Sequence, residues 1–375
     1  MCTFFYIFGT YRSLVSQKKE NKYVLSPLPP PKSKIESIEI LRQLSRSSRV
    51  LGELKGIART IPNQKMLINA IVLREAKDSS AIENIITTHD ELYKALSVKA
   101  APDQETKEVI NYRKAILKGF DLIQAQGFLR HNDIIALQNI IIENKGGIRK
   151  TPGKVLKNDR TGEVVYTPPQ DFQETNALLS NFLEYYNLRQ SYTEPLINLA
   201  ILHYQFESIH PFYDGNGRTG RILNILYLIL NGLIEIPILY LSSYINENKS
   251  EYYRLLNLVN KSDEWESWII YMLKAIEATS KQTIERITQI KESLEATIEF
   301  VAQTASKIYK KELIELLYEH PYSKIEYVVK KMGVERKAAS RYLQKLEGIG
   351  VLQSQKIGKE KIYMNVALLE ILKRH

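Results

Sequence analysis

The segment from His210 to Arg221 reads HPFYDGNGRTGR, and it lies between two strongly apolar stretches. Before it, Pro195 can open a helix, and apolar residues recur on one face of the stretch that follows. After it, an apolar run reaches from Ile222 to Leu230 and is closed by Gly232, which predicts a helix that is apolar nearly all round. We therefore expect a mainly α-helical protein in which this segment joins two helices, the second at the centre of the core.

The same segment combines groups that suit the binding of a polyphosphate. Gly215 and Gly217 permit backbone angles that direct N–H groups at an anion, and the following helix adds the positive end of its dipole. Arg218 and Arg221 lie three positions apart, so they share one helical face where their guanidinium groups can bind phosphate oxygens. A Gly-Asn-Gly sequence alone would predict only a turn. The combination predicts a nucleotide site.

Two further side chains of the segment add chemistry. Asp214 can hold a hard cation such as Mg²⁺, which keeps several waters and bridges phosphates. His210 has an ordinary pKa of about 6.5, so it can accept a hydroxyl proton near neutral pH. A base, a carboxylate and an anion-binding turn in one loop indicate an enzyme that acts on a polyphosphate.

The segment resembles the motif of the Fic family, His-x-Phe-x-(Asp/Glu)-Gly-Asn-Gly-Arg-x-x-Arg, and every specified position is present. The resemblance extends from about Leu28 to Leu273, roughly two thirds of the chain. It implies a Fic helical bundle that transfers AMP from ATP, with Mg²⁺, to a Tyr, Ser or Thr hydroxyl of a target protein. In this reaction His210 would be the general base and Asp214 the metal ligand.

The resemblance also implies a nucleotide-binding set. Asn216 and the loop amides, including those of Gly215 and Gly217, would bind the phosphates. Arg218 and Arg221 would bind the β- and γ-phosphates. Further along the chain, Tyr253 and Asn260 resemble the residues that contact the nucleotide, although by pattern alone they could equally pack on an amphipathic helix.

A second, shorter pattern precedes this core. Ser79-x-x-x-Glu83-Asn84 matches the inhibitory-helix pattern (Ser/Thr)-x-x-x-Glu-(Gly/Asn) of Fic proteins. Asp78 or Ser79 can cap a helix start and Asn84 suits a left-handed end, which predicts a one-turn helix that presents Glu83. If Glu83 pairs with Arg221, that arginine is unavailable to the γ-phosphate, and we expect autoinhibition. The alternative is a capped surface helix.

Between Gly146 and Pro169 the helical pattern breaks. Two short β-prone stretches, from Lys154 to Leu156 and from Val164 to Tyr166, flank the turn-rich tract at residues 158–162. This pattern predicts an exposed β-hairpin. The family resemblance implies that the hairpin is a flap, which would hold a target segment as an added strand. A plain surface hairpin is the alternative.

The domain organisation follows from these patterns. We expect an arm at residues 1–34 that ends in a proline tract, and a helical region at 35–130 that carries the inhibitory helix. The catalytic core would follow at 131–275, linker helices at 276–305 and a winged helix-turn-helix at 306–375. The second of these regions opens with Ile35, Ile38, Leu41 and Leu44 at three-residue steps, which predicts a helix. Residues 1–22 have no family counterpart.

The predicted winged helix carries much of the net charge of +10, with 15 Lys and Arg against 8 Asp and Glu from Ser306 to His375. Basic residues cluster on its turn and third helix, where a winged helix would face DNA phosphates. Many winged helices instead serve dimerisation or protein contact, so DNA binding stays open at this point. The residues concerned are Lys330, Lys331, Arg336, Lys337, Arg341 and Lys345.

Composition narrows the setting of the protein. Cys2 is the only cysteine, which excludes an internal disulfide framework and fits the reducing cytoplasm. The start of the chain shows no signal peptide, and the apolar run from Ile222 to Leu230 is about half of what a bilayer crossing needs. We expect no membrane partner. The oligomeric state is open, a homodimer included.

Two other functions are compatible with parts of this pattern. The first is a DNA-binding regulator whose Fic core only senses nucleotide, but sensing needs no base, and His210 is intact. The second is phosphoryl transfer as in the related Doc toxins, where lysine replaces the second motif glycine. Gly217 stands intact here, which favours AMP transfer. Removal of AMP and transfer of another nucleoside monophosphate are lesser options.

Overall fold

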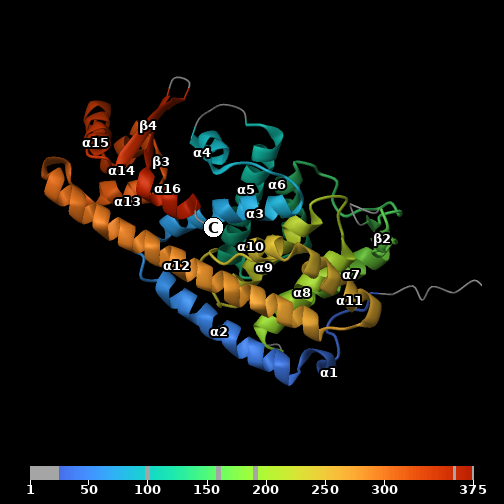
Figure 1. Cartoon of the computed structure of the whole chain (residues 1–375). Coiled ribbons are helices and arrows are strands. Elements are labelled where there is room, and N and C mark those ends of the chain that lie inside the picture. Colours follow the sequence, from blue (N-terminus) through green and yellow to red (C-terminus); the bar gives the residue numbers. More distant parts are fainter. Residues whose placement is uncertain (1–24, 98–101, 158–161, 189–192, 358–359, 374–375) are drawn as a thin grey trace, which may run out of the picture.

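The computed structural model describes residues 25–97, 102–157, 162–188, 193–357 and 360–373, and these residues are mainly helical (Figure 1). The first eight helices are α1 (Lys32–Ile35), α2 (Ile38–Ala58), α3 (Gln64–Ile82), α4 (His89–Ser97), α5 (Gln104–Gln126), α6 (His131–Ile142), α7 (Phe172–Tyr186) and α8 (Pro195–Ile209). The others are α9 (Asn216–Leu230), α10 (Ser242–Glu247), α11 (Lys249–Ser262), α12 (Glu266–Thr304), α13 (Lys311–Glu319), α14 (Ile325–Met332), α15 (Arg336–Gly348) and α16 (Val366–Lys373).

The two sheets are small and antiparallel. Strands β1 (Leu156–Lys157) and β2 (Val164–Tyr166) form the predicted hairpin, with Leu156 opposite Tyr166. Strands β3 (Tyr322–Ser323), β4 (Leu352–Ile357) and β5 (Glu360–Asn365) form the second sheet in the order β3-β5-β4. The mainly α fold with a β-hairpin is as the sequence predicted.

Helices α8 and α9 both occupy the centre of the core, where the sequence predicted only α9. Proline at the first position opens α8, where its missing N–H group costs no hydrogen bond. Every residue of α9 from Arg218 to Leu230 is buried, so this helix is enclosed by its neighbours rather than exposed on one face. Helices α3, α5 and α6 pack against α9, and α7 packs against α8.

Helix α12 is a single helix of 39 residues, where the sequence predicted several linker helices. It contains no Pro or Gly that would break it. It runs alongside α2 for much of its length (Figure 1), and Ser47 Oγ donates a hydrogen bond to the carbonyl of Leu273. The buried residues of α2 include Ile40, Leu44 and Ser47, whereas Ile38 and Leu41 are exposed. The predicted helix is therefore present, but its buried face follows a mixture of three- and four-residue spacings rather than a strict three-residue step.

Helix α3 corrects the predicted one-turn inhibitory helix. It runs unbroken for 19 residues, so Asp78 and Ser79 lie within its last turns and cap no helix start. The apolar residues that precede Asp78 pack in the core and extend the helix through the serines. The end was predicted correctly: Asn84 has φ +62°, in the left-handed region, directly after Glu83 at the C-cap.

The C-terminal elements sit at the far end of α12 (Figure 1). The turn at Gly333, with φ +63°, separates α14 from α15, and the hairpin β4–β5 follows in the position of a wing. Strand β3 and helix α16 were not predicted. The carboxyl group of Glu319 and its carbonyl accept hydrogen bonds from Asn63 (2.8 Å) and Asn69 (3.1 Å), which joins these elements to α3.

The described part of the proline tract is packed on the helical core. Leu25 and Leu28 are buried, and the Leu28 N–H donates to Asn181 Oδ1 at 2.7 Å. This stretch was predicted as an arm or linker, but these contacts attach it to α7. The question of order in residues 1–22 lies outside the described residues. Among the helices of the described residues, none has the length and apolar character of a membrane span.

Candidate active site

The loop that carries His210 is held in a defined shape by its own residues. His210 ends α8 with φ +49°, a left-handed conformation that is costly for a residue other than glycine. Asn216 closes the loop, because its side chain accepts from the Phe212 N–H (2.9 Å) and donates to the Phe212 carbonyl (2.8 Å). The Asn216 side chain is thus engaged by the loop, which restricts its predicted phosphate contact to the backbone amide.

The imidazole of His210 is neutral over a wide pH range. Burial, together with the positive charges of Lys154 and Arg149, lowers its pKa to about 3. The sequence provides only the ordinary pKa of about 6.5, because the shift comes from this folded environment. The residue therefore has its proton-accepting form at neutral pH.

Helix α9 begins directly after the loop, so its free N–H groups face the site. Gly215 is the N-cap with φ +77°, and a Cβ there would meet Ile142 at 2.8 Å, so both strain and space demand glycine. Gly217 is helical, which corrects the predicted need for a special backbone angle. A Cβ on Gly217 would instead lie 2.5 Å from Glu83 Oε1, so it is the approach of Glu83 that requires glycine here.

Arg221 is held by the end of α3. Its Nε donates to Ser79 Oγ (2.7 Å), and its Nη2 donates to the Ser79 carbonyl (3.0 Å) and to Glu83 Oε1 (3.0 Å). Burial alone would raise the pKa of Glu83, but the charge of Arg221 and its hydrogen bond hold that pKa below its ordinary value. The carboxylate is thus ionised and lies beside the start of α9, where a phosphate is expected.

Arg218 is buried and forms a different ion pair, with Glu108 Oε2 of α5 at 2.8 Å from Nη1. Its Nη2 lies 3.9 Å from Asp214 Oδ1. The Asp214 side chain itself is 71% exposed, and its Oδ1 accepts from the Gly215 N–H. The exposed carboxylate fits the chemistry of Mg²⁺, which is bound through one or two carboxylates, waters and substrate phosphates.

The segment that leads into the β1–β2 flap is joined to the loop. Ile148 forms a bridge with Phe212, and the Lys150 N–H donates to the Tyr213 hydroxyl at 2.9 Å. Within the flap region, Lys154 Nζ donates to the Tyr213 carbonyl at 3.0 Å, and the Tyr166 hydroxyl donates to the Ser208 carbonyl at 3.1 Å. The flap therefore lies next to His210.

The two residues predicted downstream to contact the nucleotide differ in their exposure to solvent. Tyr253 on α11 is exposed and stands edge-on to Tyr252. Asn260 is buried, and its Oδ1 accepts from the Tyr204 hydroxyl at 2.7 Å, which is the packing role considered as the alternative. Its Nδ2 has no partner among the described residues. Asn260 Oδ1 also accepts a longer hydrogen bond, at 3.5 Å, from the Ser208 hydroxyl, two residues before His210.

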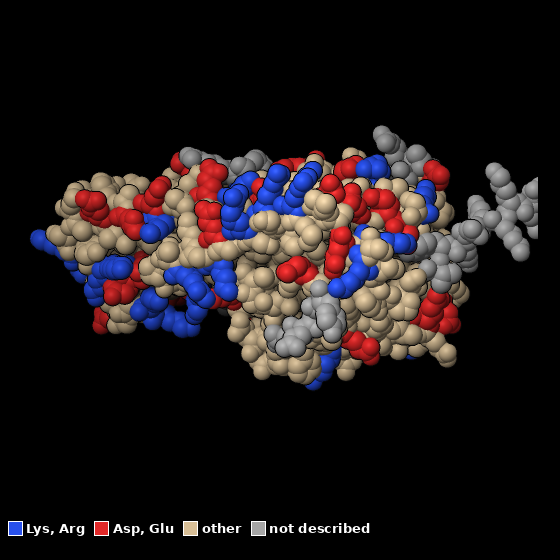
Figure 2. All heavy atoms as spheres, turned by 90° about the horizontal axis from the view of Figure 1, so that it is seen from below, with Lys and Arg blue, Asp and Glu red and all other residues tan. Residues whose placement is uncertain are grey.

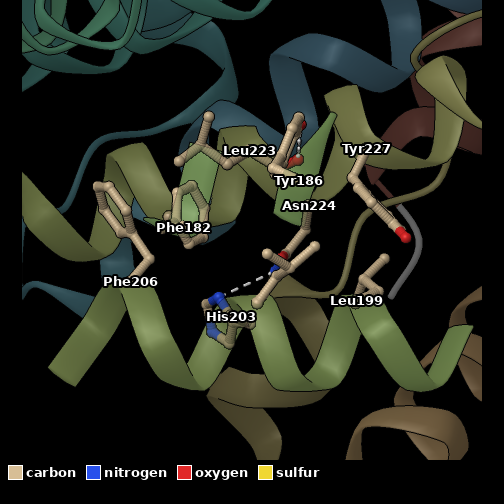
Figure 3. Close-up of a pocket in the computed structure, with 10 residues that line it drawn as sticks. Phe182, Tyr186, Leu199, His203, Phe206, Leu223, Asn224 and Tyr227 are labelled. Atoms are coloured by element: carbon tan, nitrogen blue, oxygen red, sulfur yellow. Dashed lines mark hydrogen bonds between the residues drawn. The ribbon is translucent and has the colours of Figure 1, made fainter. Parts of the chain in front are cut away.

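A tightly packed apolar space lies behind the loop and is distinct from the nucleotide site (Figure 3). The close-up shows aromatic side chains of α7 and α8 facing α9, with His203 directed at Asn224. His203 Nδ1 lies 3.1 Å from Asn224 Nδ2, and its Nε2 lies 2.9 Å from the Tyr252 hydroxyl. Burial lowers the pKa of His203 to about 3, so it is a neutral core histidine.

Sequence reasoning missed three charged residues around the loop. Glu108 lies on an ordinary amphipathic helix, so nothing marked it as the partner of Arg218. Arg149 was missed because its partners are backbone carbonyls. Glu207 precedes His210 by three positions, and burial raises its pKa to about 7. Its position in the apolar face of α8 was the one available signal.

Three family models match this chain. The model described as "Fic/DOC family N-terminal" matches residues 41–121, and the one described as "Fic/DOC family" matches residues 128–228. The model described as "Protein adenylyltransferase SoFic-like, C-terminal domain" matches residues 294–368. Together they cover most of the chain and all of the loop from His210 to Arg221. The chain therefore contains Fic/DOC family domains.

Curated relatives match a shorter part. "Protein adenylyltransferase fic-1" of Caenorhabditis elegans is 31% identical over 109 residues, which are 28% of this chain and 20% of that protein. "Protein adenylyltransferase Fic" of Drosophila grimshawi is 37% identical over 89 residues, 23% of this chain and 17% of that protein. The matched part therefore spans about a fifth of the length of these relatives.

Solved structures share the fold. A Fic family protein of Desulfovibrio desulfuricans G20 superposes with a TM-score of 0.57 at 17% identity, over 90% of this chain and 98% of that one. Residues 134–508 of Fic-1 from C. elegans superpose with a TM-score of 0.51 at 21% identity, over 66% and 73% of the two chains. These likenesses show the helical Fic fold.

Proposed function

We propose that this protein transfers AMP from ATP to a Tyr, Ser or Thr hydroxyl of a target protein. The observation that carries the proposal is one arrangement: neutral His210 ends α8, the free N–H groups of α9 begin six residues later, and the buried Arg218 and Arg221 flank them. This is a proton acceptor next to an anion-binding helix start. The curated relatives are named protein adenylyltransferases.

In the proposed reaction the target hydroxyl attacks the α-phosphorus of ATP in line with the leaving group. His210 removes the hydroxyl proton as the new P–O bond forms, and pyrophosphate leaves with the broken bond. The N–H groups at the start of α9 bind phosphate oxygens, and Arg221 binds the γ-phosphate once Glu83 has left it. Asp214 would hold Mg²⁺, which supplies charge neutralisation at the phosphates.

The proposal assigns catalysis to residues 131–275 and inhibition to the region at 35–130. While Glu83 pairs with Arg221, ATP can bind only in an unproductive pose, because the γ-phosphate lacks its partner. The flap would hold the target as an added strand, since β1 and β2 lie beside the loop that carries His210. Such docking reads backbone more than side chains.

The test is transfer of label from α-³²P-ATP with Mg²⁺ onto the purified chain and a cell lysate. Three forms are compared: wild type, Glu83→Gly, and Glu83→Gly combined with His210→Ala. We expect label to rise with the first change and to fall by roughly 10²- to 10⁴-fold with the second. Label from γ-³²P-ATP alone would instead identify a phosphotransferase of the Doc type. No label in any variant would reject both activities.

A second function concerns the C-terminal elements, for which we propose contact with duplex DNA. On the last turn of α14 and on α15, exposed basic side chains have no ion pair among the described residues, whereas Arg336 pairs with Glu326. Figure 2 shows Lys and Arg side chains at this end of the molecule, interspersed with Asp and Glu. The unpaired residues are Lys330, Lys331, Lys337, Arg341 and Lys345.

Fluorescence anisotropy with a labelled duplex tests this contact. We expect the Lys337→Ala/Arg341→Ala variant to bind more weakly and with a smaller salt dependence, because the log–log slope changes by about 0.9 for each phosphate that the protein no longer neutralises. The control is Arg42→Ala/Arg46→Ala, which removes two exposed basic residues of α2. Equal binding by both variants would reject the interface. DNA binding that responds to ATP without AMP transfer would favour a nucleotide-sensing regulator.

A further inference from the structure

Arg149 is a buried arginine without an ion pair. Its side chain is 1% exposed, and among the described residues no Asp or Glu lies within ion-pair distance. A buried guanidinium normally has a carboxylate partner, because an unpaired charge is costly to remove from water. Its burial lowers the pKa of Arg149, although the group stays charged at neutral pH. Such a costly residue calls for a specific role.

The guanidinium of Arg149 binds backbone carbonyls from two segments that are distant in sequence. Its Nε donates to the His210 carbonyl at 2.8 Å, and its Nη2 donates to the carbonyls of Ile209 (3.3 Å) and Pro169. The backbone N–H of Arg149 also donates to the Pro211 carbonyl at 2.9 Å. One residue thus fixes three successive residues at the start of the catalytic loop.

These contacts act where the loop needs support. His210 has φ +49°, a conformation that persists only if the surrounding structure holds it. Arg149 and Pro169 lie at the two ends of the flap segment, so the guanidinium also joins both ends of the flap to the residue that carries the imidazole. No other side chain of the described residues has a hydrogen bond to the His210 carbonyl.

We propose that Arg149 is a positioning residue that holds the main chain of His210, and hence its imidazole, in the orientation needed to accept the target's proton. Arg149 acts through His210 and touches no substrate. The role in catalysis rests on the proposed AMP transfer, whereas the effect on the orientation of His210 does not. The charged groups around the imidazole are Arg149, Lys154 and Glu83, and Glu174 faces Arg149 itself.

The kinetic test uses Arg149→Lys and Arg149→Met in the Glu83→Gly background. Lysine keeps the charge but lacks the planar fork that reaches several carbonyls. We expect kcat to fall by roughly 10- to 100-fold in both variants, the loss that follows a displacement of about 1 Å. The KM for ATP should stay within about twofold, since the start of α9 and Arg221 are unchanged. A rise in KM at constant kcat would overturn the proposal.

A spectroscopic test does not need activity. In protein labelled with ¹³C and ¹⁵N at histidine, the His210 ring signals, assigned with His210→Ala, should shift in both Arg149 variants. They should stay in place in the matched controls Arg254→Lys and Arg254→Met, since Arg254 is an exposed residue paired with Glu251. Unchanged His210 signals in folded Arg149 variants would overturn the positioning role. If AMP transfer itself is absent, this test still decides the inference.

A measurement on the wild type covers the case in which the variants fail to fold. The Arg149 Nε–H should exchange with solvent far more slowly than the Arg254 Nε–H, and it should show a nuclear Overhauser contact to His210. Equally fast exchange of both groups would show that the hydrogen bond to the His210 carbonyl is not maintained, and it would overturn the proposal.

Discussion

Glu83 Oε1 lies 3.0 Å from Arg221 Nη2 and would lie 2.5 Å from a Cβ on Gly217. The carboxylate thus satisfies an arginine and at the same time fills the space beside the first turn of α9. A phosphate group bound here would need both that arginine and that space. In the proposed mechanism, inhibition by Glu83 would therefore be competition between two anions for one site.

Replacing Glu83 by glycine should raise AMP transfer. A hydrogen bond to a charged group is worth roughly 1.5–3 kcal/mol, so freeing Arg221 for the γ-phosphate predicts an increase of roughly 10- to 150-fold. Initial rates of transfer from α-³²P-ATP measure the effect. Glu235→Gly is the matched control, because Glu235 pairs with Arg59 beyond the other end of α9. Equal rates for the two variants would exclude autoinhibition by Glu83.

Ser79→Ala should release inhibition only in part. Ser79 Oγ accepts from Arg221 Nε at 2.7 Å and so holds the guanidinium against α3, but the carboxylate of Glu83 remains. We expect a rate between those of wild type and Glu83→Gly. Once Glu83 is absent, adding Ser79→Ala should change the rate by less than about twofold. A larger effect of Ser79→Ala than of Glu83→Gly would contradict this order.

Gly217→Ala tests the contact through stability. In the wild type the new methyl group meets Glu83 Oε1, and we expect a loss of about 1–3 kcal/mol in the free energy of unfolding. In the Glu83→Gly background only Arg221 Nη1, at 2.9 Å, remains close to the new Cβ, so the cost should be smaller. The helical preference of alanine offsets part of it. Chemical denaturation of the four proteins gives the coupling. The same cost in both backgrounds would mean that the carboxylate does not lie there.

His210 should make stability depend on pH in acid. Its pKa is about 3 in the folded protein against 6.5 for an ordinary histidine. As pH falls below 6.5, the unfolded chain takes up a proton that the folded chain does not, so the wild type should lose stability relative to His210→Ala. The slope is at most about 1.4 kcal/mol per pH unit, and solvent screening at this partly exposed residue reduces it. Parallel pH profiles of unfolding would refute the lowered pKa.

Glu207 should lower the stability of the folded protein as pH rises, whereas His210 lowers it as pH falls. Burial raises its pKa from 4.5 to about 7, so the folded protein keeps a proton that the unfolded chain releases. The wild type should therefore lose stability relative to Glu207→Gln as pH rises from about 4.5 to 7, with little further change above that. Denaturation of both proteins across this range gives the difference. A difference that is constant with pH would show that Glu207 is ionised throughout.

The sequence predicted the parts of this molecule that local chemistry determines. Pro195, the loop glycines and Gly232 mark the ends of α8 and α9, and the turn residues near 158–162 mark the hairpin. The extent of α3 was not predictable in this way, because Ser79 and Ser80 suggest a cap when read locally. Both serines are buried within the helix, and Ser79 accepts a hydrogen bond there from Arg221, more than a hundred positions away.

The same limit explains the residues that were missed around the loop. Arg149 binds carbonyl groups, which every residue has, so no pattern of side chains could reveal its partners. Glu108 meets Arg218 only through the packing of α5 on α9. The contact between Glu83 and Arg221 was predictable only because the family resemblance supplied a partner for each.

The two ends of helix α3 contact two different parts of the molecule. Asn63 at its start donates to Glu319 of the C-terminal elements, and Glu83 at its end occupies the site beside α9. The helix is about 28 Å long and buried along its length, so a shift at one end is carried to the other. If a molecule that binds the C-terminal elements changes the affinity for ATP in the proposed reaction, thermodynamic linkage requires ATP to change the affinity for that molecule by the same factor.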